Sequence, residues 1–132
     1  MRLPIFCLLA LVVSCNLMKN ESIVGVCFNT KQSDTLAVIQ TSQLHNFDGE
    51  IVRVKGIFIN YFEDVALYPQ GNKKSESAFW LNFTDELASR YSEVRKLHSR
   101  TVELYGRVNM KRKGHLSSYA GSIDSIFCIK PV

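Results

Sequence analysis

The stretch from residue 48 to residue 60 constrains the fold more than any other part of the chain. It opens on Asp48-Gly49, a dipeptide typical of turns. The residues on one face of the extended strand that follows are apolar, with one glycine among them: Val52, Val54, Gly56 and Phe58. Such period-two alternation indicates a half-buried β-strand, and a glycine inside it marks a bulge or a sharp bend. Ile57 and Ile59 are apolar on the otherwise polar face, so we expect that face to be covered beyond the bend. The pattern predicts a long, bent strand over residues 50–62, the kind of strand with which a small closed barrel begins.

Four later segments also read as strands, with turn residues between them: 65–68, 78–83, 101–108 and 121–130. Phe79 and Leu81 share one face of the second of these, and Trp80 and Asn82 share the other. Gly106 repeats, inside the segment 101–108, the mid-strand glycine of the first strand. Residues 84–98 have apolar side chains at helical spacing after a capping threonine and two acidic residues.

The order of elements is therefore three strands, one helix and two strands. This is the order of the OB-fold, a five-stranded Greek-key barrel with a helix between strands three and four. Another small β-barrel or an α+β domain with the same element order is the alternative. We predict a mainly β, OB-fold-like domain over residues 35–132. A short helix over 41–47, capped by Thr41 or Ser42, precedes the first barrel strand.

Composition limits the function classes only loosely. The 132 residues are 46% hydrophobic and 21% charged, with a formal net charge of +4. This is ordinary for one globular domain. The mild basic excess permits an acidic partner without requiring one, and a basic domain with no polyanionic ligand is the simpler interpretation.

The first residues predict export. Arg2 precedes an apolar run over 3–13 that is too short to span a bilayer. The sequence Val12-Val13-Ser14-Cys15 resembles the lipobox of bacterial lipoproteins, which implies a signal peptide over 1–14, a lipid on Cys15, and a lipidated tether with a short extra strand over 15–34. A plain secretory signal is the alternative. Asn16 after the cysteine resembles the enteric sorting pattern for the outer membrane, facing the periplasm.

Export also changes the expectation for the cysteines. Cys7 would leave with the signal peptide and Cys15 would carry lipid, so Cys27 and Cys128 are the two thiols of the folded part. An even pair in an oxidising compartment is a candidate disulfide. Two buried free cysteines acting as small apolar residues are the alternative.

Two segments resemble parts of OB-type domains in small exported bacterial proteins. One is residues 44–58, in which a short helix and an Asp-Gly turn precede a Val-x-Val-x-Gly strand. The other joins Gly114-His115-Leu116 to 119–123 and is similar to the connection between strands four and five in such proteins. The resemblance covers residues 41–130. It implies the fold, and it says almost nothing of activity, since fold does not give function.

No motif indicates catalysis, a metal site or a cofactor. The chain has no Gly-x-Ser-x-Gly, no phosphate-binding glycine pattern and no paired metal-ligand spacing. His45, His98 and His115 are far apart in sequence. We therefore predict a protein that is not an enzyme and that needs no cofactor and no metal.

A binding surface is better supported by the sequence. OB-folds commonly bind ligands across strands two and three and the adjoining loops. Aromatic and polar or basic residues map to that surface: Tyr61, Tyr68, Trp80, Asn82, Lys111, Arg112, Lys113, His115 and Tyr119. Aromatic rings beside cations suit single-stranded nucleic acid or sugars. The alternative is that Tyr61 and Trp80 pack beneath the helix or a loop as core, with Lys111-Arg112-Lys113 as a solvated rim.

These observations favour a membrane-anchored envelope lipoprotein that acts as a non-enzymatic binding module. Its partners would be the membrane, through Cys15, and an envelope protein, a glycan or a small ligand. A single-stranded nucleic-acid-binding OB domain is the alternative, which requires that the apolar start is not a signal. An exported protein rarely meets nucleic acid, so we do not expect that partner.

Overall fold

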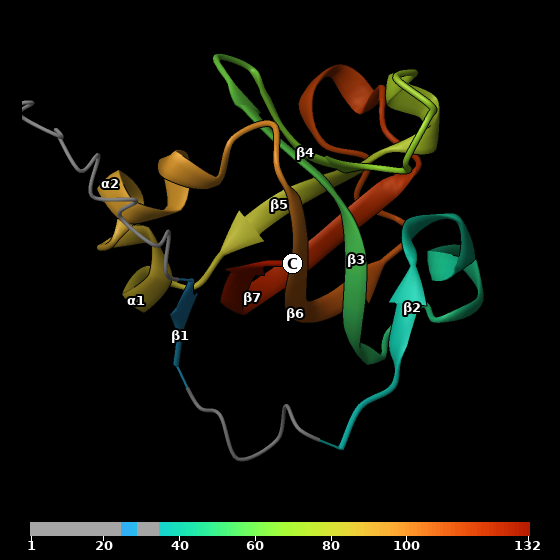
Figure 1. The fold of residues 1–132 in the computed structure, drawn as a ribbon. Helices are drawn as coiled ribbons and strands as arrows, with labels where there is room; N and C mark the ends of the chain where they lie inside the picture. The colour runs from blue at the N-terminus through green and yellow to red at the C-terminus, as the bar shows by residue number, and fades with distance from the viewer. Residues whose placement is uncertain (1–24, 29–34) are drawn as a thin grey trace, which may run out of the picture.

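The computed structural model describes residues 25–28 and 35–132, and the predicted signal peptide and Cys15 lie outside them. Five strands form a closed barrel (Figure 1). Their bounds follow the predicted segments closely: β3 Ile51–Tyr61, β4 Asp64–Tyr68, β5 Phe79–Phe83, β6 Thr101–Asn109 and β7 Gly121–Pro131.

The pairing of these strands confirms the predicted fold class. β3 pairs with both β4 and β6, β4 pairs with β5, and β7 closes the barrel by pairing with β5 and β6. The β5–β7 pair is parallel and the others are antiparallel. This is a mainly β, OB-fold-like barrel, in which closure leaves the barrel strands without open edges.

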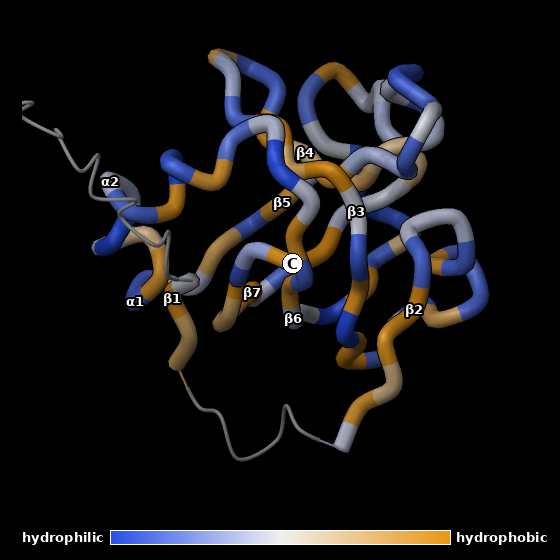
Figure 2. The backbone as a smooth tube through the Cα atoms, viewed as in Figure 1, coloured by the Kyte–Doolittle hydropathy of each residue, from blue (hydrophilic) through white to orange (hydrophobic). Residues whose placement is uncertain are grey.

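The alternating residues of β3 point inward as predicted. Val54 and Phe58 are fully buried, and the same holds for the inward residues of β6 and β7, such as Leu104 and Ile129. Figure 2 shows apolar and polar residues alternating along these strands. A second, smaller apolar cluster lies outside the barrel, where Ile57 and Ile59 pack against Ala66, Tyr68, Ala78, Trp80 and Tyr119. Ile57 and Ile59 are only partly buried, so the expectation that the outer face becomes covered beyond Gly56 is met in part.

The two mid-strand glycines lie where the sheet changes partner or register. β3 pairs with β6 up to Ile57 and with β4 from Ile57 onward, so Gly56 immediately precedes the change of partner. The register between β6 and β7 shifts opposite Gly106, where one β6 residue between Tyr105 and Arg107 faces three β7 residues between Asp124 and Cys128, so the bulge lies on β7. A glycine allows close approach at such points, because a Cβ at Gly106 would lie 2.6 Å from Cγ2 of Ile123.

The helical segment between β5 and β6 differs from the prediction of one helix. It consists of α1 Asp85–Ala88, α2 Tyr91–Val94 and the 3-10 turn η4 Arg95–Leu97. The hydroxyl of Ser89 donates to the carbonyl of Glu86 at 2.6 Å, and a side chain that bonds the backbone in this way competes with helix propagation. The apolar residues of the segment still face the barrel, and Leu87, Val94 and Leu97 are buried.

The short elements before the barrel also differ in detail. β2 Val38–Gln40 pairs in parallel with β3, and η2 Thr41–Asn46 is a 3-10 helix. Its N-cap is Gln40, which forms a capping box with Gln43, so the expected cap at Thr41 or Ser42 is wrong. Thr41 is buried, and its hydroxyl donates to the carbonyl of Lys55 at 2.8 Å.

β1 Val26–Cys27 is the extra strand expected before the domain, and it pairs antiparallel with β7. Cys27 lies opposite Cys128 in this register, and the two form a disulfide with a sequence separation of 101. Among the described residues, the remaining elements are the single 3-10 turns η3 Ser75–Ser77 and η5 His115–Ser117 in the loops. Over the ranges 25–28 and 35–132, no helix is long and apolar enough to cross a membrane.

Candidate functional site

Two tyrosines from the predicted binding surface converge on one carboxylate. The hydroxyl of Tyr68, on β4, donates to both carboxylate oxygens of Asp64 at 3.1 Å. The hydroxyl of Tyr119, at the end of the β6–β7 loop, donates to Oδ1 of Asp64 at 2.6 Å. Asp64 is the first residue of β4. The structure thus joins the first hairpin to the β6–β7 loop through this carboxylate.

Both tyrosines are held in the protonated, donating form. Burial, the hydrogen bond to Asp64 and the charge of that carboxylate raise the pKa of Tyr68 to about 12. The same causes raise the pKa of Tyr119 further. A carboxylate has about four lone-pair sites, and each phenol donates one proton, so Asp64 keeps capacity to accept further hydrogen bonds.

We expect Asp64→Asn to lower the pKa of both Tyr68 and Tyr119, because the amide removes the negative charge that opposes phenolate formation. The decrease is partial, since burial remains the largest cause. Ultraviolet titration of tyrosinate formation measures this decrease in pKa. The variants Tyr68→Phe and Tyr119→Phe assign the part of the titration that occurs at the highest pH. An unchanged alkaline titration in Asp64→Asn would contradict the hydrogen-bond assignment.

The same pKa shift gives a pH dependence of stability. A phenol whose pKa is raised by folding contributes stability that is complete below its unfolded pKa of about 10. That contribution is lost as pH rises through the folded pKa, which is about 12 for Tyr68. The free energy of unfolding of the wild type is therefore expected to fall across this window, and to fall less in Tyr68→Phe.

Trp80 is partly buried, and two rings of the β6–β7 loop contact its ring. Its ring is stacked at 28° to that of His115 with centroids 6.3 Å apart, and it contacts the ring of Tyr119 at 5.3 Å. Gly114, with a φ of +68°, lies so close that a Cβ there would be 2.6 Å from Cβ of Trp80. The alternative in which Trp80 packs beneath a loop therefore matches the structure. Tyr61, by contrast, is 64% exposed, and its ring contacts that of His98 at 4.4 Å.

Asn82 and Arg112 belong to a second centre, around Asp124. Asn82 Nδ2 donates to Asp124 at 2.7 Å, Ser122 Oγ donates at 2.8 Å, and Asn109 Nδ2 donates at 3.1 Å. Arg112 lies 3.8 Å from the same carboxylate. Burial opposes ionisation of this group, but the hydrogen bonds and the arginine outweigh it and lower the pKa of Asp124. This network is internally satisfied, whereas Lys111 and Lys113 are exposed.

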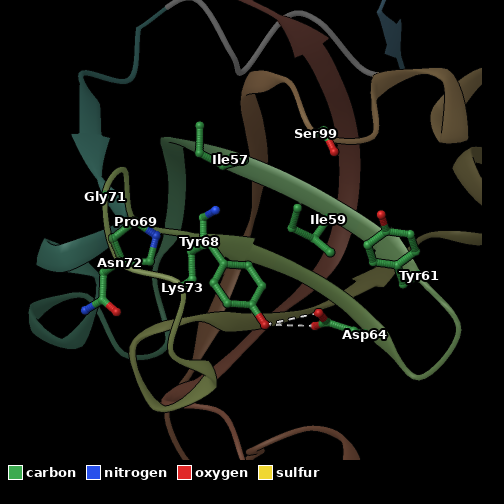
Figure 3. A pocket seen from close by; sticks show the side chains of 10 residues that line it. All are labelled: Ile57, Ile59, Tyr61, Asp64, Tyr68, Pro69, Gly71, Asn72, Lys73 and Ser99. Atoms are coloured by element: carbon green, nitrogen blue, oxygen red, sulfur yellow. Dashed lines mark hydrogen bonds between the residues drawn. The ribbon is translucent and has the colours of Figure 1, made fainter.

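A pocket of about 370 Å³ lies on the outer face of β3 and β4, beside Asp64 (Figure 3). Ile57, Ile59 and the ring of Tyr68 form its apolar floor. Tyr61 and Asp64 stand at one end, and the β4–β5 loop closes the other. That loop and the segment before β6 contribute the rest of the lining: Pro69, Gly71, Asn72, Lys73 and Ser99.

Of the predicted binding residues, the pocket includes Tyr61 and Tyr68, and Tyr119 reaches it through Asp64. Sequence reasoning did not assign Asp64, Ile57, Ile59 or Lys73 to a site. The two isoleucines were noticed as apolar residues on a polar face, which was the one available indication. Asp64 gave none, because an acidic residue after Glu63 is typical of a solvated turn.

Within the described part of the chain, no group of three or more His, Cys, Asp or Glu side chains is placed to hold a metal ion. Comparison of the chain with protein-family models, with curated proteins and with solved structures gave no match.

Proposed function

We propose that the protein is a non-enzymatic binding module, anchored in the bacterial cell envelope by a lipid on Cys15, whose ligand occupies the β3–β4 pocket. The small barrel supports a binding role, because OB-fold barrels commonly bind ligands across strands two and three, here β4 and β5, and β4 forms one side of the pocket. The observation that carries the proposal is the carboxylate of Asp64, which lines an apolar pocket with acceptor capacity left over.

The chemistry of the pocket favours a small amphipathic ligand with a hydrogen-bond donor. An ammonium group suits Asp64 best, because hydrogen bonds between charged partners are about twice as strong as neutral ones. The exposed ring of Tyr61 at the same end can add a cation–π contact. The apolar part of the ligand would then cover Ile57 and Ile59.

Thermal unfolding of the full chain, measured against small amines, amino sugars and uncharged sugars, tests this proposal. We expect amine-bearing compounds to raise the melting temperature by several degrees, because a ligand at about 100 times its Kd stabilises the folded state by about 2.7 kcal/mol. Asp64→Asn and Ile59→Lys should abolish the shift. Val38→Lys, on the partly exposed edge strand β2, is the matched control.

A shift that persists in Asp64→Asn, or no shift with any probe class, would reject the pocket as the binding site. The nucleic-acid alternative is less well supported, because the ring of Trp80 is already stacked with that of His115 and in edge contact with that of Tyr119. It predicts an affinity for single-stranded DNA that falls steeply with salt. A steep salt slope with Asp64→Asn unaffected would favour that alternative.

A further inference from the structure

Two loop tips at one end of the barrel expose large apolar side chains. Phe62, in the β3–β4 turn, is 92% exposed, and Leu116, in the β6–β7 loop, is 82% exposed. Figure 2 shows apolar segments at the tips of both loops. Oε2 of Glu63 lies 3.5 Å from Nε2 of His115, so the neighbours of Phe62 and Leu116 are in contact. We call the surface formed by Phe62 and Leu116 the tip patch.

The backbone holds this exposed arrangement in place. Glu63, Leu116 and Ser117 have φ values of 60°, 55° and 53°, a left-handed conformation that residues with a Cβ rarely adopt. Such outliers persist where the surrounding structure determines them, and they are commoner at functional sites than elsewhere. An apolar side chain kept in solvent by a costly conformation is not explained by stability of the isolated domain.

The charges on the loops beside the tip patch are mainly positive, although the acidic Glu63 follows Phe62 directly. The β6–β7 loop contains Lys111, Arg112 and Lys113 and has no acidic residue between positions 110 and 120. Arg112 lies near Asp124, but neither Lys111 nor Lys113 forms an ion pair with any residue that the structure describes. The β4–β5 loop lies at the same end of the barrel in Figure 1 and adds two lysines, Lys73 and Lys74, against one acidic residue, Glu76.

We propose that the tip patch docks the domain onto an anionic membrane surface. Exposed apolar side chains enter the boundary between headgroups and acyl chains, and lysines beside them attract anionic lipids. A lipid on Cys15 would hold the domain close to the membrane, since Cys15 and Gly25 are ten positions apart and the chain between them spans at most about 35 Å. This proposal goes beyond the ligand pocket, because it uses a different surface and different residues.

Tryptophan introduced at either tip reports insertion directly. Phe62→Trp and Leu116→Trp would be made in the full chain, bound to vesicles of brominated phosphatidylcholine with or without an equal part of phosphatidylglycerol. We expect the added emission, after subtraction of the Trp80 signal, to fall by about half on the anionic vesicles only. In the double variant Lys111→Glu, Lys113→Glu, the emission of the introduced tryptophan on anionic vesicles should return to its value on neutral vesicles.

Matched controls keep this test specific. Val38→Trp places the ring at an exposed apolar position on β2, away from the β3–β4, β4–β5 and β6–β7 loops in Figure 1. The emission of this tryptophan should not be quenched. Lys96→Glu reverses an exposed charge outside the loops and should leave quenching unchanged. Equal quenching at positions 62, 116 and 38, equal quenching on neutral and anionic vesicles, or no quenching on either would each overturn the proposal. Loss of amine binding by Asp64→Asn with quenching intact would separate the two sites.

Discussion

Replacing Gly106 by alanine is expected to lower the free energy of unfolding by about 3 kcal/mol, at the upper end of the usual cost of overpacking a core. A Cβ at this position would lie 2.6 Å from Cγ2 of Ile123, 2.9 Å from Cγ1 of Ile126 and 2.9 Å from the carbonyl oxygen of Asp124. Both isoleucines are fully buried, so neither can move away without disturbing the barrel interior. Urea denaturation followed by circular dichroism measures the change.

Gly71→Ala is the matched control for this prediction. Gly71 has a φ of +79° and no atom within 4 Å of the added Cβ, so alanine there meets only the backbone penalty. We expect a cost of about 1 kcal/mol, the lower end for a left-handed residue with a Cβ. If the two variants lose the same stability, close packing of Gly106 against the bulge of β7 is not what requires a glycine there.

Removing the Cys27–Cys128 disulfide is expected to cost about 3 to 4 kcal/mol. The two cysteines are separated by 101 residues, and a cross-link that closes a loop of this length restricts the unfolded chain strongly. The bond also fastens β1, a strand of two residues, to β7. Urea denaturation of Cys27→Ala with Cys128→Ala, compared with the oxidised wild type, measures the loss.

Reductant provides the control for the disulfide. It should destabilise the wild type to about the level of the double variant and leave the double variant unchanged. Intact mass of protein purified from its membrane fraction would show the bond as a loss of two hydrogens, and would also test cleavage before Cys15 and acylation. A wild type that does not respond to reductant would contradict the stabilising role of the bond.

The barrel could be predicted because its determinants are local. Alternation in β3, β5 and β6, turn residues between them and a capped helical start are all short-range patterns in the sequence. The prediction of one helix over 84–98 was wrong, because the spacing of apolar residues does not reveal that the Ser89 hydroxyl donates a hydrogen bond to the carbonyl of Glu86. Leu87, Val94 and Leu97 are nevertheless buried as their spacing predicted, since burial against the barrel does not need an unbroken helix, whereas Tyr91 is 48% exposed.

The candidate site could be predicted only in part. Residues on β4 and β5 were assigned to the outer face from strand periodicity, which fixes direction but not neighbours. Only the closed barrel brings Tyr119 to Asp64 across 55 positions of sequence, and only the fold of the β6–β7 loop covers Trp80. The pocket beside Asp64 depends on these long-range contacts and on the course of the β4–β5 loop.

By itself, the sequence determined the strand order, the faces of the strands and the positions of the two mid-strand glycines, because period-two burial and steric exclusion act over a few residues. Tertiary structure alone decided which polar groups meet. Asp64 acquired two tyrosine donors, Asp124 acquired four partners, and Glu63 of the β3–β4 turn came into contact with His115 of the β6–β7 loop. Such contacts depend on loop closure and packing between segments far apart in the chain, for which local sequence carries no pattern.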